Sequence, residues 1–225
     1  MSLSSAVRLT SVTVANSYRD GVYLYNGSHF ELDTVKVVLG NAAGNGVYIG
    51  GASDVRARNL YGGNAGTGIW LTALTNCVLQ NVYSTSRIMI RGGVNLVVQG
   101  ATAFWMGEDW TLRFQSNPSA SAATGGNFFS HFLAPTSGGA HIDGMSRSTF
   151  SNLAVQTVRN DDGLSPYYSL KGAYPAALQL ENGSYLKFVG NILANHTFTY
   201  AQDCQIGPGD TDFNDAFDES WSSVD

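Results

Sequence analysis

The sequence repeats one strand pattern, which reads Gly21-Val-Tyr-Leu-Tyr-Asn, Gly46-Val-Tyr-Ile-Gly-Gly, Gly68-Ile-Trp-Leu-Thr-Ala and Arg87-Ile-Met-Ile-Arg-Gly. Two later segments, Ala140-His-Ile-Asp-Gly and Leu178-Gln-Leu-Glu-Asn, follow the same pattern. Each segment alternates residues of two kinds, which is typical of a short β-strand with one buried face. A strand that recurs in this way predicts a fold built from structural repeats.

Two more strands follow each copy at nearly fixed offsets. The offsets are counted from the second inward residue of each copy, which is Leu24, Ile49, Leu71, Ile90, Ile142 or Leu180. An alternating pair comes six and eight positions later, and an apolar residue comes eleven or twelve positions later. A further copy fits around Phe114, and the steps between copies vary from 19 to 38 residues. The chain is therefore predicted to be an all-β solenoid, a parallel β-helix of about seven turns with three short strands per turn.

Stacked turns place equivalent residues in columns with a spacing of about 4.8 Å. An inward column contains Cys77, which we interpret as a core thiol. A column at one bend is predicted to consist largely of asparagines, namely Asn59, Asn81, Asn127, Asn152 and Asn191. Amide side chains hydrogen-bond along such a column, and asparagine also favours left-handed turns, so both explanations of this column are structural.

The composition agrees with many short strands and tight turns. The 225 residues include 26 glycines and 17 asparagines, while charged residues make up 13%, about half of the usual share. A net charge of -5 gives no electrostatic reason to expect nucleic acid as a partner. No apolar stretch approaches 18 residues, so membrane insertion is not expected, and no cofactor or metal motif is recognisable. We expect the β-helix to occupy residues 1–200 and an acidic extension or cap to occupy residues 201–225.

The repeat covers about Val7 to Ile192 and resembles the right-handed pectin-lyase-like β-helix proteins. Among these, motifs typical of pectate lyases, polygalacturonases and alginate epimerases are not recognisable. The lysine-poor, asparagine-rich and glycine-rich chain looks most like a tailspike depolymerase segment of a bacteriophage. This resemblance implies a right-handed, single-stranded β-helix that binds and cleaves a bacterial surface polysaccharide, as a glycosidase or a lyase. It also implies a location at a virion tail or a cell surface.

Two outward columns flank the inward reference residues. The first contains Tyr23, Tyr48, Trp70, Met89, Arg113, His141 and Gln179. The second contains Tyr25, Gly50, Thr72, Arg91, Gln115, Asp143 and Glu181. Outward aromatic rings suit the apolar faces of sugars, so Trp70, Tyr48, Arg91 and Arg113 are candidate substrate-binding residues. The alternative is ordinary cross-strand stacking or burial in a subunit interface.

Asp143 and Glu181 occupy the same outward column in consecutive turns, with His141 beside them. Their carboxyl groups are expected to lie about 5 Å apart, the separation of a retaining glycosidase pair. These three residues are the candidate catalytic group. The alternative is a solvated polar face in which a carboxylate pairs with an arginine, or a lyase centred on Arg91, Arg113 or His141.

A loop after the fourth turn holds a second acidic pair, Glu108 and Asp109, between Trp105 and Trp110. An acid and an aromatic ring on a protruding loop are typical of a sugar-binding rim, so this pair is the second choice for catalysis. Alternatively, the tryptophans anchor the insertion to the solenoid.

The first turn begins without a segment that would cover it, and open solenoid ends aggregate. We therefore expect the chain to be a fragment of a longer protein or to cover this end by self-association, with a homotrimer as the expected state. The opposing functional hypothesis is a non-catalytic β-helix, structural or carbohydrate-binding, from a fibre or surface protein.

Overall fold

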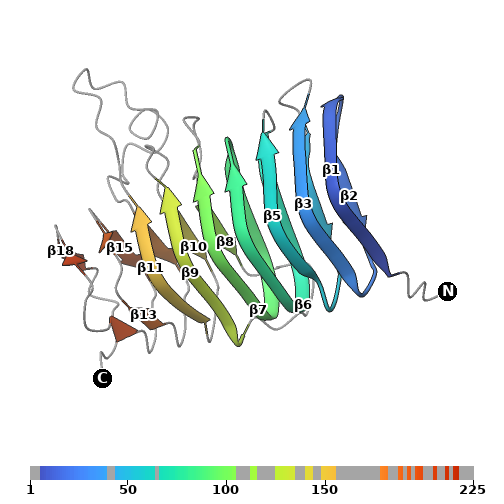
Figure 1. The fold of residues 1–225 in the computed structure, drawn as a ribbon. Coiled ribbons are helices and arrows are strands. Elements are labelled where there is room, and N and C mark those ends of the chain that lie inside the picture. Colours follow the sequence, from blue (N-terminus) through green and yellow to red (C-terminus); the bar gives the residue numbers. More distant parts are fainter. Residues whose placement is uncertain are drawn as a thin grey trace, which may run out of the picture.

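The chain forms a parallel β-solenoid in the computed structural model (Figure 1). The structure describes residues 6–39, 44–63, 66–104, 112–115, 125–134, 140–143, 148–155, 178–181, 187–189, 192–193, 196–199, 205–206, 211–212 and 215–217. No helix occurs in these segments, and accordingly none that is long and apolar enough to cross a membrane. The predicted all-β parallel solenoid is confirmed.

The strands, in chain order, are β1 (Val7–Ser17), β2 (Val22–Tyr25), β3 (Phe30–Leu39), β4 (Asn45–Gly50), β5 (Arg56–Gly63), β6 (Thr67–Ser84), β7 (Arg87–Ala103), β8 (Leu112–Gln115), β9 (Asn127–Ala134), β10 (Ala140–Asp143), β11 (Ser148–Val155), β12 (Leu178–Glu181), β13 (Lys187–Val189), β14 (Ile192–Leu193), β15 (His196–Thr199), β16 (Gln205–Ile206), β17 (Thr211–Asp212) and β18 (Asp215–Phe217).

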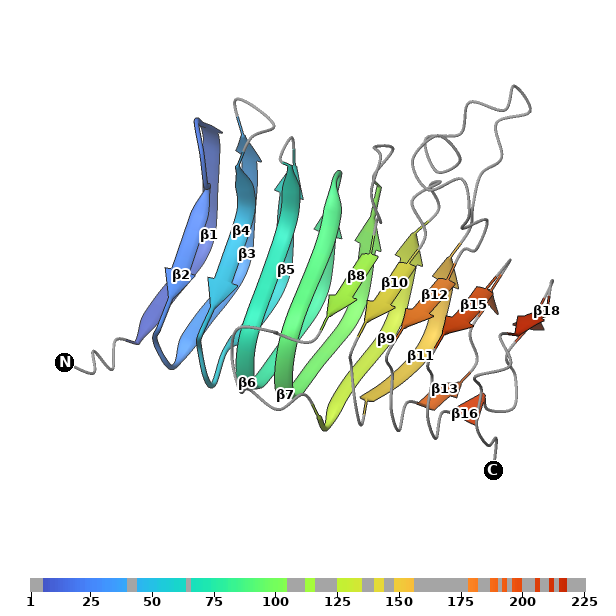
Figure 2. The ribbon, with the colours of Figure 1, turned by 180° about the vertical axis from the view of Figure 1, so that it is seen from behind.

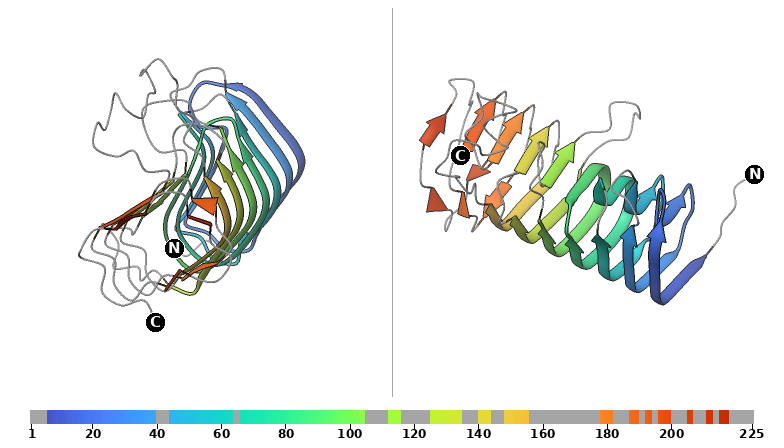
Figure 3. Two further views of the ribbon diagram at one scale, coloured as in Figure 1. Left: turned by 90° about the vertical axis from the view of Figure 1, so that its left-hand side faces the viewer. Right: turned by 90° about the horizontal axis from the view of Figure 1, so that it is seen from above.

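Strand pairing follows two parallel series along the solenoid axis. The first sheet runs through β2, β4, the start of β6, the start of β7, β8, β10, β12, β15 and β18. The second sheet runs through β1, β3, β5, the rest of β6 and β7, β9 and β11. Figures 1 and 2 show these strands side by side from the two sides, and Figure 3 shows successive turns overlying one another along the axis.

The part whose side chains the structure describes comprises about five turns, where the sequence predicts about seven. The same parallel pairing continues from β10 through β12 and β15 to β18. Three short strands per turn were expected, but β6 has 18 residues and β7 has 17, so each spans a whole turn. Single residues with left-handed backbone, such as Ala73, Asn76 and Asn81 in β6, make each bend while the neighbouring ladder bonds persist.

The core lies between the two sheets and consists of stacked inward side chains. Ile49, Leu71 and Ile90 are fully buried and pair rung by rung. Cys77 is buried among them, which confirms the prediction of a core thiol. Its Sγ donates to the Thr75 carbonyl at 3.1 Å, and burial raises the pKa of this thiol.

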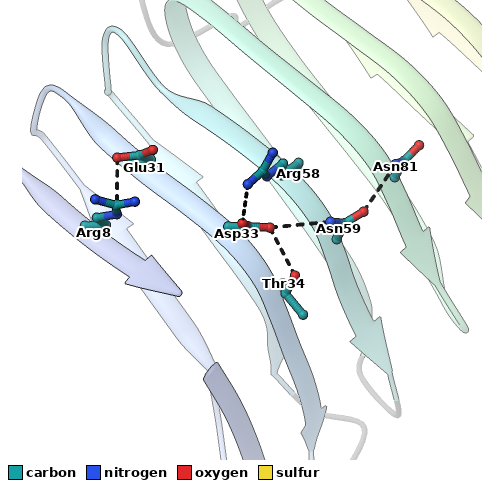
Figure 4. Close-up of polar contacts among 7 residues, drawn as sticks. All are labelled: Arg8, Glu31, Asp33, Thr34, Arg58, Asn59 and Asn81. Atoms are coloured by element: carbon teal, nitrogen blue, oxygen red, sulfur yellow. Dashed lines mark hydrogen bonds and ion pairs between the residues drawn. The ribbon is translucent and has the colours of Figure 1, made fainter. Parts of the chain in front are cut away.

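The predicted asparagine column is confirmed at two of its positions. Asn81 Nδ2 donates to Asn59 Oδ1 at 3.2 Å, and Asn59 Nδ2 donates to Asp33 Oδ1 at 3.4 Å (Figure 4). By register, the same bend column also contains Thr34 and Gly100. Asparagine side chains therefore do link successive turns at this bend. The side chain of Asn152 and all of Asn191 lie outside the described residues.

The prediction for Asn127 is wrong, because this residue faces the core. It pairs in register with Ser148, which the sequence pattern places at an inward position, six residues after Ile142. Its buried Oδ1 accepts from the Leu96 N–H at 3.0 Å, and its Nδ2 donates to the Gly93 carbonyl at 3.0 Å. His131 occupies the bend position instead and has the left-handed backbone. The long insertion before β9 hides this shift of phase from sequence reasoning.

Candidate functional site

The two outward columns predicted from the sequence are confirmed by the register of the first sheet. Residues of the first column pair in the order Tyr23, Tyr48, Trp70, Met89, Arg113, His141 and Gln179. Residues of the second column pair in the order Tyr25, Gly50, Thr72, Arg91, Gln115, Asp143 and Glu181. One face of one sheet therefore carries the aromatic, basic and acidic candidates in succession along the axis.

An aromatic ladder, defined as Tyr23, Tyr25, Tyr48 and Trp70, forms the N-terminal part of this face. The rings of Tyr23 and Tyr48 stack with centroids 4.5 Å apart and an interplanar angle of 7°. Tyr48 meets Trp70 edge to face at 5.6 Å, and Tyr25 packs against Tyr48 at 6.4 Å. Such pairs stabilise a sheet by about 0.5–1.5 kcal/mol each beyond the area that they bury.

Gly50 creates the space that Tyr48 occupies. A Cβ atom placed on Gly50 would lie within 3.0 Å of three atoms of the Tyr48 ring and hydroxyl group. The ring therefore leans along its own strand across the glycine that follows two positions later. The pattern Tyr-x-Gly in β4 thus fixes the direction of Tyr48, which alternation alone does not predict.

Exposure falls along the ladder toward the middle of the solenoid. Tyr23 and Tyr25 are each 55% exposed, Tyr48 and Trp70 are half-buried, and Met89 in the next rung is only 6% exposed. Met89 was expected to be an outward residue open to solvent, and this expectation is wrong. Met89 lies in the predicted column, but its side chain is shielded from solvent.

Stacking also limits what the rings offer to a ligand. The facing surfaces of Tyr23 and Tyr48 cover each other. Among the described residues, the other face of Tyr23 meets no stacked ring, since β2 pairs with β4 alone. The cross-strand stacking considered as an alternative is therefore real for Tyr48, while the freest aromatic surface is at Tyr23 and Tyr25.

Basic residues follow the aromatic ladder. The guanidinium carbon of Arg91 lies 5.8 Å from the centroid of the Trp70 ring, in cation–π contact. Arg113 comes one rung later in the first column, and both arginines are half-buried. Burial and the neighbouring tyrosines raise the pKa of Tyr48, while the charge of Arg91 opposes this shift.

Trp70 contains a buried donor. Its Nε1–H has no acceptor in the part of the chain that the structure describes. An unsatisfied buried donor of this kind costs about 1–3 kcal/mol. A ligand oxygen that reached it would recover part of that cost.

Asp143 and Glu181 pair directly in the parallel register between β10 and β12. Neighbouring strands lie about 4.8 Å apart, so the predicted placement of the two acids on adjacent rungs of one column is confirmed. His141 pairs with Arg113 on one side and Gln179 on the other. The structure describes the backbone of these strands, and the catalytic roles of the three side chains stay predictions.

The second-choice group lies outside the described residues, because Trp105, Glu108, Asp109 and Trp110 all fall between β7 and β8. Within the described segments, no cluster of histidine, cysteine and acidic side chains is arranged to hold a metal ion.

Sequence reasoning missed a second ladder on the other sheet. The rings of Tyr61 and Tyr83 stack at 5.2 Å, and the Lys36 ammonium group lies 5.3 Å from the centroid of Tyr61. Lys36, Tyr61 and Tyr83 come twelve positions after Leu24, Ile49 and Leu71, so the repeat could have predicted that they form one column. We call Lys36, Tyr61 and Tyr83 the second ladder.

Ion pairs on the second sheet were also not predicted. Arg58 donates to Asp33 at 2.6 Å, and Arg8 lies 3.4 Å from Glu31 (Figure 4). The hydrogen bond from Arg58 lowers the pKa of Asp33. Both pairs link successive turns, and both arginine side chains are exposed, so we interpret the pairs as structural.

No family model matches the chain, and comparisons with curated proteins and with solved structures found no significant similarity. The fold class therefore rests on the strand pairing, and function has to be argued from the chemistry of the face itself.

Proposed function

We propose that the chain binds an extended polysaccharide along the outward face of the first sheet. The observation that carries this proposal is the register, which aligns the two outward columns from Tyr23 to Gln179 over six steps. At about 4.8 Å per step, the face is about 29 Å long. A straight face of this length, with aromatic and ionisable side chains in succession, suits a linear polymer better than a small molecule.

Each part of the face has a distinct task in this proposal. Tyr23 and Tyr25 offer exposed ring surface and hydroxyl groups, which together match the apolar faces and hydroxyls of sugars. Arg91 and Arg113 supply donors for sugar hydroxyls or carboxylates.

We propose further that Asp143 and Glu181 cleave the bound polymer, with His141 beside them. Two carboxyl groups on adjacent rungs suit a retaining glycosidase, in which one acts as acid and the other as nucleophile. A tailspike-like protein at a virion tail or cell surface is the setting that the fold class and the composition favour.

The test of cleavage uses bacterial surface polysaccharides as substrates and the release of oligosaccharides as readout. Glu181→Gln and Asp143→Asn should each lower the rate about 10²- to 10⁴-fold without weakening binding, because an amide cannot exchange the proton. Glu31→Gln is the matched control, since Glu31 is an exposed carboxylate on the second sheet. Full activity of both amide variants would refute the catalytic assignment and leave the binding proposal to be judged separately.

The test of binding compares the two ladders. Tyr23→Ala and Tyr25→Ala should weaken binding to the same polysaccharides, while Tyr83→Ala in the second ladder should not. Equal losses from all three variants would contradict a binding face on the first sheet. Bound polysaccharide without new reducing or unsaturated ends would favour the non-catalytic, carbohydrate-binding β-helix.

The competing role of the aromatic ladder is contact between subunits of a homotrimer. Large apolar side chains are indeed exposed at several places, including Tyr18 at 81% as well as Tyr23 and Tyr25. Such exposure is typical of binding surfaces of either kind. Light scattering separates the two roles: a trimer that dissociates on Tyr23→Ala would assign the ladder to the interface, and an unchanged mass would leave it to the glycan.

A further inference from the structure

Three glycines at the bends lie under the amide oxygen of an asparagine from the preceding turn. A Cβ atom on Gly51 or Gly126 would come closer than 3.0 Å to Asn26 Oδ1 or Asn95 Oδ1 respectively, which real side chains do not tolerate. All three glycines have left-handed backbone, with φ between 57° and 68°. Gly51 and Gly126 therefore leave no space for a side chain.

Gly100 differs from the other two because the asparagine oxygen lies farther from it. A Cβ atom there would lie 3.2 Å from Asn81 Oδ1, a contact that a small movement of Asn81 relieves. Gly100 also interrupts the asparagine column, since Asn59 and Asn81 precede it and His131 follows it in register. The column thus lacks a side chain at one rung.

A surface hollow lies at this interruption. The described residues that line it are Gln80, Asn81, Gln99, Gly100 and His131. It sits on the second sheet, away from the face proposed to bind polysaccharide. The described lining includes no carboxylate, lysine or arginine, and His131 is its one titratable side chain.

The hydrogen bonds already made leave donors and acceptors unused at the hollow. Gln80 Nε2 donates to Gln99 Oε1 at 3.1 Å, which leaves the amide hydrogens of Gln99 and the carbonyl oxygen of Gln80 for a ligand. Asn81 uses its Nδ2 toward Asn59, so its Oδ1 faces the Gly100 rung as an acceptor. Neutral donors and acceptors side by side match hydroxyl groups, each of which both donates and accepts.

The geometry points to a second binding site, in which this amide-lined hollow holds a neutral sugar unit through two neighbouring hydroxyl groups. One hydroxyl donates to Asn81 Oδ1 above Gly100, and the other accepts from Gln99 Nε2. The site is separate from the aromatic ladder and does not depend on the function proposed for that face. It takes a neutral sugar because the donors and acceptors that the argument uses are those of neutral side-chain amides.

The experiment follows the side-chain amide NMR signals of ¹⁵N-labelled protein during titration with neutral probes. The probes are the methyl glycosides of glucose, galactose and mannose, with trans-1,2-cyclohexanediol as a minimal diol and cyclohexanol as a single-hydroxyl control. At least one glycoside should shift the Gln99 and Asn81 signals saturably, the diol should do so more weakly, and cyclohexanol should not. Absence of a saturable shift with every glycoside would overturn the proposal.

Two variants test the location of the site. Gly100→Asn fills the hollow with a residue that suits the left-handed backbone, so it should weaken binding about tenfold or more. Gln99→Met keeps the volume but removes the amide, and should weaken binding similarly even if the first variant folds poorly. Thr34→Asn alters the same column three turns away from Gly100 and should leave binding unchanged.

The ladder variants keep this site distinct from the proposed function. Tyr23→Ala and Tyr25→Ala should not affect glycoside binding at the hollow, whatever they do to the polysaccharide. Undiminished binding to both Gly100→Asn and Gln99→Met would refute the assignment. Loss of hollow binding in the ladder variants would show that the glycosides bind the first sheet instead.

Discussion

Thr34 is the β-branched residue in a bend column whose next two rungs are asparagines, Asn59 and Asn81. Its φ is +57°, the left-handed region, although threonine is β-branched. This conformation costs an ordinary L-residue about 1–2 kcal/mol, and asparagine tolerates it better than other non-glycine residues do. Replacing Thr34 by Asn should therefore remove about 1 kcal/mol of backbone strain.

The side-chain contributions of this change nearly cancel. Thr34 Oγ1 donates to Asp33 Oδ1 at 3.0 Å, and Thr34→Asn loses that bond. The new amide oxygen lies where Asn59 Nδ2 can reach it, as Asn81 Nδ2 reaches Asn59 Oδ1 at 3.2 Å. Asn59 Nδ2 now makes a longer contact of 3.4 Å with Asp33. The backbone term decides the sign, and the variant should be more stable by about 1 kcal/mol.

Thr34→Gly is the comparison that separates the two effects. Glycine relieves the same strain, but it gains freedom in the unfolded chain, which costs about 0.5–1 kcal/mol, and it adds no ladder bond. We expect Thr34→Gly to differ little from the parent chain. The difference between the asparagine and glycine variants then measures the ladder itself.

Thermal unfolding followed by circular dichroism measures these changes. For a chain of 150–250 residues, 1 kcal/mol shifts the midpoint by about 2–4 °C. Tryptophan fluorescence, to which Trp70 contributes, is a second probe of the same transition. If Thr34→Asn is less stable than the parent chain, or no better than Thr34→Gly, the column of amides does not stabilise the fold.

Three further predictions concern the core and the ladder. Leu71→Asp should abolish soluble expression because it buries an unpaired carboxylate, whereas Thr72→Asp, one position along the strand, should change the unfolding free energy by at most about 1 kcal/mol. Cys77 should resist alkylation at mildly alkaline pH until the chain unfolds, since burial raises its pKa and covers its sulfur; peptide-resolved mass spectrometry would show this. Gly50→Ala should displace the Tyr48 ring and alter the near-ultraviolet circular dichroism, and an unchanged spectrum would contradict the packing described for this pair.

The parallel solenoid was predictable because burial imposes the same choice in every turn. Ile49, Leu71 and Ile90 are all fully buried and pair in register, so the repeat of the sequence pattern matches the strand pairing of the structure. Phe114 was placed correctly despite the insertions near it, since a short alternating strand surrounds it. Asn127 was misplaced because a polar residue in a buried position gives no apolar signal, and its backbone partners belong to β7, 31 and 34 residues earlier in the chain.

The outward columns were predictable as positions but not as surfaces. Alternation tells which side of the sheet a residue faces, and it assigned Met89 and Asp143 to the correct columns. It does not tell what covers that side, so the burial of Met89 was missed. Nor does it give the direction of a ring, which for Tyr48 depends on the absence of a side chain at Gly50.

The bends explain why asparagine and glycine are so frequent in this chain. Because these residues are needed for the fold, their presence at a bend is not evidence of function. Half of the non-glycine residues with positive φ in the described part are asparagines, although the remainder are of several types. Each bend needs a residue that tolerates left-handed backbone, and a glycine suits a rung whose space is taken by an amide oxygen, as Gly51 lies under Asn26. The identity of a bend residue is thus largely set by its column.

Outward strand positions carry no such constraint, so a run such as Trp70, Arg91 and Arg113 on one face calls for an explanation beyond folding. The exception at the bends is Gly100, which lines the surface hollow on the second sheet.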